Sequence, residues 1–95
     1  MIRRDGARMV ISGPATLATA ARLLEEGRRY LAEGVATVDL AEVSELDSSL
    51  LALALEWLRE ARAAQRELAF ANPPEALQTL CRLYGVEGLL PVASA

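Results

Sequence analysis

A chain of 95 residues with a formal charge of −3 and one cysteine fits a single small domain. It lacks a basic run for nucleic acid phosphates, a histidine to complete a metal site with Cys81, and a second cysteine for an intrachain disulfide. Its apolar runs are far shorter than the roughly 20 residues of a membrane-spanning helix, so we expect a soluble, cytoplasmic protein that binds no nucleic acid and does not insert into a membrane.

The N-terminal third predicts a hairpin followed by a helix. Residues 2–4 and 7–12 flank Asp5-Gly6, a dipeptide suited to a tight turn because glycine accepts a positive φ. Gly13-Pro14 ends the hairpin, and Thr16 can cap a helix that runs to about residue 33. Apolar residues recur at helical spacing along it: Leu17, Ala20, Leu24 and Leu31.

The middle of the chain predicts a buried strand, a loop and the longest helix. Residues 35–40 are short and β-branched, as in a buried strand, and residues 41–46 are expected to be a loop. A helix is predicted from about residue 47 to residue 66. Its first turns are apolar on every side, which requires burial or a partner on one face.

The remaining elements are a strand over residues 67–71 and a helix that begins after Asn72-Pro73-Pro74 and stops at Gly85. The apolar stripe of this helix is predicted to hold Leu77, Leu80, Cys81 and Tyr84. Hairpin, helix, strand, helix, strand and helix together predict an α/β fold with right-handed crossovers. We therefore expect a mostly parallel or mixed four-stranded sheet, with an N-terminal hairpin and helices packed on it.

The sequence has few residues of the types that catalyse reactions or bind cofactors and metals. No hydroxyl, thiol or histidine combination resembles a nucleophile and its base, and no glycine-rich phosphate loop is present, so we expect no enzymatic activity, cofactor or metal. Cys81 is expected to be a buried, inert thiol and Trp57 a core residue. Asp39 is expected at the carboxyl end of its strand, where it can bond backbone amides, although open α/β sheets also place ligands at that end.

The segment Asp47-Ser48-Ser49 has two interpretations. Its side-chain oxygens can cap the long helix, which explains the residue types completely. A hydroxyl at a strand–loop–helix junction is also exposed enough to meet a partner protein or a kinase. Phosphate on Ser48 would add negative charge beside Asp47, Glu45 and Glu42, and could thereby release a partner.

The chain resembles the STAS family (sulfate transporter and anti-sigma factor antagonist) over nearly its whole length. The resemblance is carried by Val38-Asp39-Leu40-Ala41-Glu42-Val43 and Leu46-Asp47-Ser48-Ser49-Leu50, at the predicted strand–loop–helix junction. It implies that residues 1–95 form one STAS domain. A domain from a larger transporter is disfavoured by the Met1 start and the complete predicted topology.

Two branches of the family differ in what they imply. In anti-sigma factor antagonists the motif usually continues with Gly-Leu-Gly, and the serine after the aspartate is phosphorylated by a kinase that is also the anti-sigma factor. Here Leu50-Leu51 replaces the first glycine. The downstream half of the chain is more similar to the small STAS subunit of Mla-type phospholipid-transport ABC systems. Three segments carry this similarity: Leu53-Ala54-Leu55-Glu56-Trp57-Leu58, Ala69-Phe70-Ala71-Asn72-Pro73-Pro74 and Leu80-Cys81-Arg82-Leu83-Tyr84-Gly85-Val86.

The second resemblance implies a noncatalytic subunit bound to a cytoplasmic ATPase at the inner membrane, which supports transporter assembly and activity. We expect the partner contact at Asp47, Ser48, Ser49, Leu50 and Leu51, with Ser48 as a possible phosphorylation site. The alternative is an anti-sigma factor antagonist that is controlled by phosphorylation and binds an anti-sigma kinase.

Overall fold

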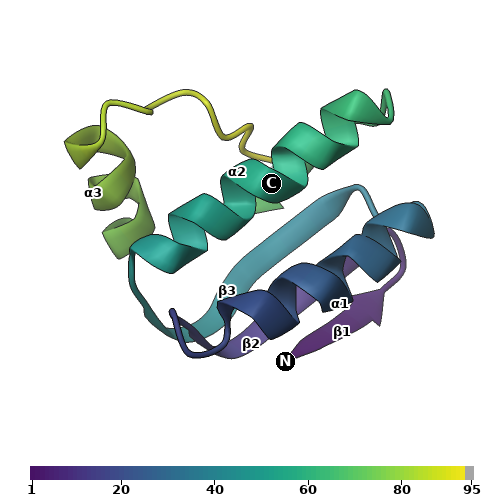
Figure 1. Ribbon diagram of the computed structural model, residues 1–95, viewed down its shortest axis with the longest axis horizontal. Coiled ribbons are helices and arrows are strands. Elements are labelled where there is room, and N and C mark those ends of the chain that lie inside the picture. The colour runs from purple at the N-terminus through teal and green to yellow at the C-terminus, as the bar shows by residue number, and fades with distance from the viewer. Residues whose placement is uncertain (94–95) are drawn as a thin grey trace.

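The computed structural model describes residues 1–93, in which a four-stranded sheet is combined with three helices (Figure 1). The elements in chain order are β1 (Ile2–Asp5), β2 (Arg8–Ala15), α1 (Ala20–Ala32), β3 (Thr37–Leu46), α2 (Ser48–Ala63), β4 (Ala69–Ala71) and α3 (Glu75–Leu83). The strand order is β1-β2-β3-β4, with β1 antiparallel to β2 and the other two pairs parallel. The predicted α/β fold, with its opening hairpin and mixed sheet, is confirmed.

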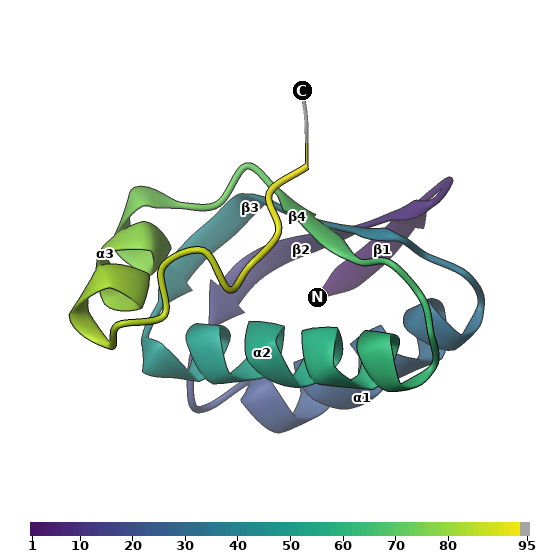
Figure 2. The ribbon, with the colours of Figure 1, turned by 90° about the horizontal axis from the view of Figure 1, so that it is seen from above.

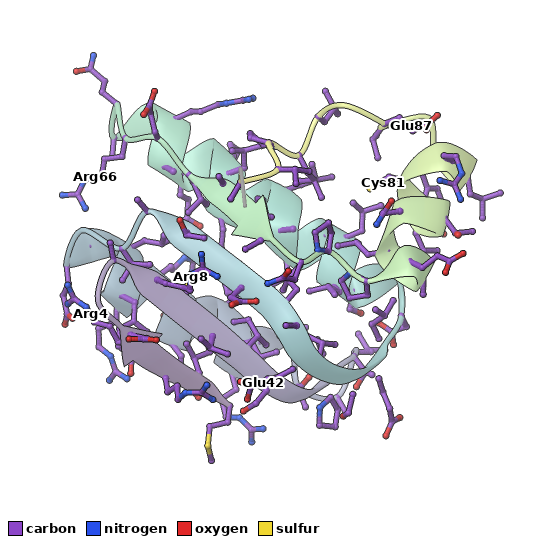
Figure 3. The ribbon with its side chains drawn as sticks, turned by 180° about the vertical axis from the view of Figure 1, so that it is seen from behind. Arg4, Arg8, Glu42, Arg66, Cys81 and Glu87 are labelled. Carbon is purple, nitrogen blue, oxygen red and sulfur yellow. The ribbon has the colours of Figure 1, made fainter. Side chains whose placement is uncertain are left out.

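Both long helices lie on the same face of the sheet (Figure 2). Alternate strand residues face them and join one apolar cluster with helix residues: Met9, Ile11, Val38, Leu40 and Phe70. The opposite face carries polar side chains, among them Arg8 and Glu42 (Figure 3). There Arg3 pairs with Glu42 and Arg8 pairs with Asp39, each at 2.7 Å. The sheet therefore has one face in the core and one face that is largely polar.

The contact between α1 and α2 is close because Gly27 has no side chain. Trp57 of α2 is completely buried, and its indole Nε1–H donates to the Leu24 carbonyl of α1 at 3.3 Å. A Cβ at Gly27 would lie only 2.3 to 2.5 Å from three indole atoms. The prediction that Trp57 is a core residue is confirmed, and Gly27 is the residue that makes room for it.

The predicted loop over residues 41–46 is wrong, because β3 continues as a strand to Leu46. This extension pairs with the end of β2, where Ser12 lies opposite Glu42 and Ala15 opposite Leu46. Two register shifts interrupt the ladder, so the side chains do not alternate regularly. Backbone pairing with β2 thus forms a strand from a sequence without a clear strand pattern.

The helix predicted to follow an N-cap at Thr16 begins three residues later than expected, since its N-cap residue is Thr19 and its first residue is Ala20. The Thr19 hydroxyl donates to the Pro14 carbonyl at 3.0 Å and accepts the Thr16 N–H at 3.0 Å, which closes the connection instead of extending the helix. Leu17 consequently lies outside the helix and is 79% exposed. Its predicted place on the apolar stripe is wrong.

The C-terminal helix α3 is close to the prediction. Leu77 and Cys81 are buried, and Gly85, with φ +69°, follows the end of the helix. Tyr84, predicted on the buried stripe, is 58% exposed because α3 ends before it, at Leu83. Within residues 1–93, no helix has the length and apolar character needed to cross a membrane.

Candidate functional site

The candidate site is the turn that leads from β3 into α2. Asp47 is the N-cap residue of α2, and its Oδ1 accepts the Ser49 N–H at 2.8 Å. Its other carboxylate oxygen, Oδ2, accepts the Leu17 N–H at 3.0 Å. One side chain therefore caps α2 and also fastens the β2–α1 connection to it, a contact 30 residues away in sequence.

These two hydrogen bonds set the charge at the turn. The backbone N–H of Leu17, followed by that of Ser49, lowers the pKa of the Asp47 carboxyl group. Asp47 is therefore ionised at neutral pH. Glu42, expected to add to this negative charge, accepts hydrogen bonds from Nη1 and Nη2 of Arg3 at 2.8 and 2.7 Å, which lowers the pKa of Glu42 and offsets its charge.

The five residues predicted to contact a partner divide into two groups. Asp47 and Ser48 are exposed and Ser49 is half-buried, so these three can meet another molecule. Leu50 and Leu51 are 0% and 5% exposed and belong to the core. Their predicted role as contact residues needs correction: they anchor the first turn of α2 from inside, and the available surface is Asp47-Ser48-Ser49.

Leu17 is the residue at this site that the sequence interpretation missed. Its spacing from Ala20 and Leu24 suggested a buried helical position, whereas the Asp47 carboxylate holds its backbone at the surface. Thr19 offered the signal that could have found it. Threonine is as good an N-cap residue at position 19 as at position 16, and a helix that begins after Thr19 leaves Leu17 in the connection.

Asp39 lies within β3 and not at its carboxyl end as predicted. It does accept a backbone N–H, that of Ala41 at 3.0 Å, and it also accepts from Arg8 at 2.7 Å and from Asn72 at 3.0 Å. Burial alone would raise the pKa of Asp39, but the hydrogen bonds from Asn72, Ala41 and Arg8 together lower it. These partners occupy both of its carboxylate oxygens, so Asp39 joins β2, β3 and the residue after β4.

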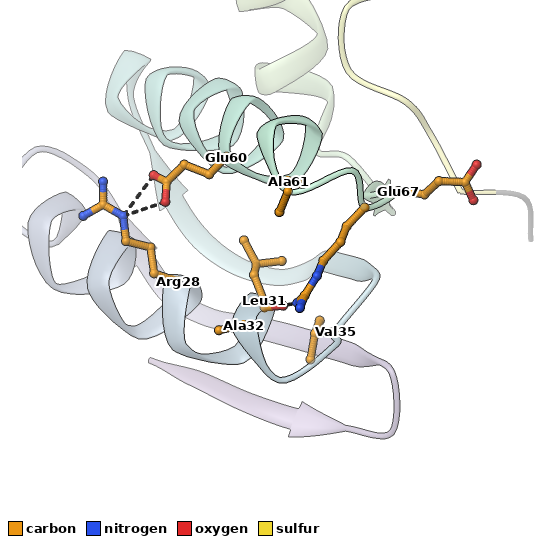
Figure 4. A pocket seen from close by; sticks show the side chains of 9 residues that line it. Arg28, Leu31, Ala32, Val35, Glu60, Ala61 and Glu67 are labelled. Atoms are coloured by element: carbon orange, nitrogen blue, oxygen red, sulfur yellow. Dashed lines mark hydrogen bonds and ion pairs between the residues drawn. The ribbon is translucent and has the colours of Figure 1, made fainter.

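Two of the hollows on the described part of the molecule lie beside α1 and α3. One of about 230 Å³ lies between the C-terminal halves of α1 and α2, where Arg28 binds Glu60 at 2.9 Å and Arg66 donates to the Leu31 carbonyl (Figure 4). The other, of about 430 Å³, lies between α3 and residues 86–92 and has Cys81 in its lining. Neither includes a residue of the Asp47-Ser48-Ser49 turn.

The thiol of Cys81 is not activated. Burial, together with the negative charge of Glu87, raises the pKa of this thiol above its ordinary value. Figure 3 shows both residues at the α3 end of the molecule. Cys81 is thus protonated at neutral pH and packs as a small apolar side chain, as its sequence position predicted.

The chain is thus a small α/β domain with one polar sheet face and an exposed, capped helix start. The family model described as "Mlab, STAS domain" (STAS_2) matches residues 1–91, so the chain belongs to the STAS domain family. No curated protein matches the sequence.

Several solved structures share the fold. The anti-sigma factor antagonist SpoIIAA in its unphosphorylated form is 16% identical, with a TM-score of 0.72 over 99% of this chain and 87% of that chain. A putative anti-sigma factor antagonist from Thermotoga maritima is 13% identical, with a TM-score of 0.76 over 100% of this chain and 86% of that one. The Bacillus cell fate determinant SpoIIAA in its phosphorylated form is 16% identical, with a TM-score of 0.68 over 99% and 90%. At these identities the similarity concerns the fold.

Proposed function

We propose that this STAS domain is a noncatalytic accessory subunit of a Mla-type phospholipid-transport ABC system. In this role it binds the cytoplasmic ATPase subunit, supports the assembly and activity of the transporter, and is held at the inner membrane by that partner. The observation that carries the proposal is an exposed Asp47-Ser48-Ser49 turn, fixed by hydrogen bonds, in a chain whose family model is described as Mlab. The resemblance to the transporter branch supports this proposal, since it implies an ATPase contact at this turn.

The geometry suits a docking surface. Asp47 is fixed from two sides and Leu50 lies beneath it in the core, so the turn loses little conformational freedom when a partner binds. Ser48 presents an exposed hydroxyl from the first position of α2. A preorganised turn with an exposed hydroxyl and a carboxylate provides specific polar contacts at low entropic cost.

The proposal is tested by affinity purification from native membranes. The chain, tagged at its C-terminus, is used as bait, and copurifying proteins are identified by mass spectrometry. We expect an ABC ATPase and its permease in stoichiometric amounts. A bait that is folded by circular dichroism but recovers no ATPase would contradict the proposal. A neighbouring set of genes for an ATPase, a permease and a periplasmic lipid-binding protein would support it independently.

The second candidate function is that of an anti-sigma factor antagonist. It is favoured by the fold shared with SpoIIAA and by the exposure of Ser48 beside Asp47. Incubation with a cognate anti-sigma kinase and radiolabelled ATP tests it. Labelling that disappears in Ser48→Ala and persists in Ser49→Ala would establish this function in place of the first, and absence of labelling in the wild-type chain would contradict it.

A further inference from the structure

We infer that the β2–α1 connection, residues 16–19, forms the second half of the docking surface, with Leu17 as its apolar anchor. The inference rests on the proposed function and adds to it the chemistry of the partner's surface. It assigns Leu17 to an apolar socket on the ATPase and the Asp47 turn to the rim of that socket.

The first observation is that Leu17 is exposed but held in place. Leu17 is 79% exposed, the largest fraction among the exposed large apolar residues of the described part of the chain. Its backbone N–H is nevertheless bound by the Asp47 carboxylate at 3.0 Å. Two residues later, the Thr19 hydroxyl bonds the Pro14 carbonyl and the Thr16 N–H, each at 3.0 Å. An apolar side chain on a connection closed in this way is presented to a partner at low entropic cost.

The second observation is that the connection and the Asp47 turn lie at the same end of the molecule. The last residues of β2 pair with the last residues of β3, with Pro14 opposite Glu45 and Ala15 opposite Leu46. The two chain segments that follow are then joined by the Asp47 carboxylate. In Figure 1, α1 and α2 begin at the same end of the molecule, and the two segments lead into them there. A partner that covers Ser48 therefore meets Leu17 on the same surface.

The charges beside Leu17 determine which charged side chains the partner needs around its apolar socket. Asp47 is ionised, and Glu45, opposite Pro14, is exposed. Glu42 is already bound by Arg3 and contributes little. The complementary surface is thus an apolar socket bordered by arginine or lysine side chains. Contacts of this kind combine a desolvated apolar centre with a polar rim.

A matched pair of variants tests the inference. Leu17→Ser removes the anchor, and Leu83→Ser changes a leucine that is similarly exposed, at 73%, at the end of α3. The probe is the ATPase that copurifies with the wild-type chain, titrated against each variant by isothermal calorimetry. We expect Leu17→Ser to raise the Kd by about tenfold or more and Leu83→Ser to leave it within about twofold. Both variants should keep the wild-type Tm, because both side chains are exposed.

A third variant tests the link through Asp47. Asp47→Ala releases the Leu17 backbone, so we expect it to weaken binding, and we expect the double variant Asp47→Ala/Leu17→Ser to be weaker by less than the product of the two single effects. An unchanged Kd for Leu17→Ser, or equal weakening by Leu17→Ser and Leu83→Ser, would overturn the inference while the proposed function stands. Failure to recover any ATPase with the wild-type chain would overturn both.

Discussion

Helix α2 is held by different forces at its start and in its middle. In the middle, Trp57 is completely buried against Gly27 of α1, and the contact leaves no room for even one additional carbon atom. At the start, the Asp47 carboxylate fixes the chain through two backbone N–H groups, while Ser48 remains exposed. The apolar contact should therefore govern stability, whereas the polar turn should govern recognition.

Removal of Trp57 should have the largest effect on stability. Trp57→Ala leaves a cavity between α1 and α2 and deletes the hydrogen bond to the Leu24 carbonyl, at a cost of about 3–5 kcal/mol in the free energy of unfolding. Chemical denaturation followed by circular dichroism measures this cost, with Trp57→Phe as the milder control. A loss below about 1 kcal/mol would mean that the contact between α1 and α2 is not a main source of stability.

Gly27→Ala tests the same contact from the other helix. Alanine is favoured over glycine inside a helix by about 1 kcal/mol. The new Cβ would however lie 2.3 to 2.5 Å from the Trp57 indole, and such overpacking costs about 1–3 kcal/mol or more. We expect a net destabilisation of about 2 kcal/mol by chemical denaturation.

The control for this substitution is the double variant Gly27→Ala/Trp57→Phe. Phenylalanine lacks the three indole atoms that the new Cβ would approach, Cζ2, Cε2 and Nε1, so the double variant should lose less stability than the sum of the two single variants. Strict additivity, or a stabilised Gly27→Ala, would show that α1 and α2 move apart easily and that the close contact is not required.

The sequence predicted this apolar contact only in part, and the reason is the range of the interactions. The helical spacing of Trp57 with Leu50 and Leu53 was sufficient to predict its burial, because periodicity depends on local sequence. The role of Gly27 was not predictable in this way, since only the packing of α1 against α2 shows that a side chain there would collide. The cap at Asp47 was predictable from its residue type, but its bond to Leu17 joins residues 30 positions apart.

The same distinction explains the errors in the fold. Residues 41–46 form part of β3 because they pair with β2, a long-range contact that outweighs local composition. Leu50 and Leu51 were predicted to contact a partner because apolar residues surround the helix start. In the structure Leu50 and Leu51 pack into the core, so the surface at the helix start is formed by Asp47 and Ser48, together with Leu17 from another segment.

Asp39 combines features of the buried middle and the polar start of α2, since it is a largely buried polar group whose two carboxylate oxygens both accept hydrogen bonds. Asp39→Asn keeps an acceptor for Ala41 but places an amide near the Arg8 guanidinium, so we expect a loss of about 1 kcal/mol at pH 7. The pKa of Asp39 is lowered by folding, so its contribution is present above the unfolded value near 4 and is lost as the pH falls through the lower folded value.

The measurement is the difference in unfolding free energy between wild type and Asp39→Asn from pH 7 down to pH 2.5. The difference should shrink below about pH 4, as the wild-type carboxylate is protonated in the unfolded state and then in the folded state. A difference that stays constant with pH would indicate that the substitution acts through packing alone, and not through the charge of Asp39.

The smallest effect on stability and a large effect on binding are expected together at Ser48. Ser48→Asp leaves the Asp47 cap in place and adds a carboxylate in the first turn of α2, where the helix dipole offsets part of its repulsion by Asp47. The Tm should therefore change by no more than about 3 °C, while the added charge on the docking surface weakens ATPase binding by about tenfold or more.

Thr79→Asp is the matched control, because it adds the same charge to an exposed hydroxyl position on α3, beside Arg82. If Ser48→Asp lowers stability and binding in proportion, the Asp47 turn serves the helix alone. If both aspartate variants bind normally, the docking surface lies away from α2, and the division between a stabilising middle and a recognising start of that helix does not hold.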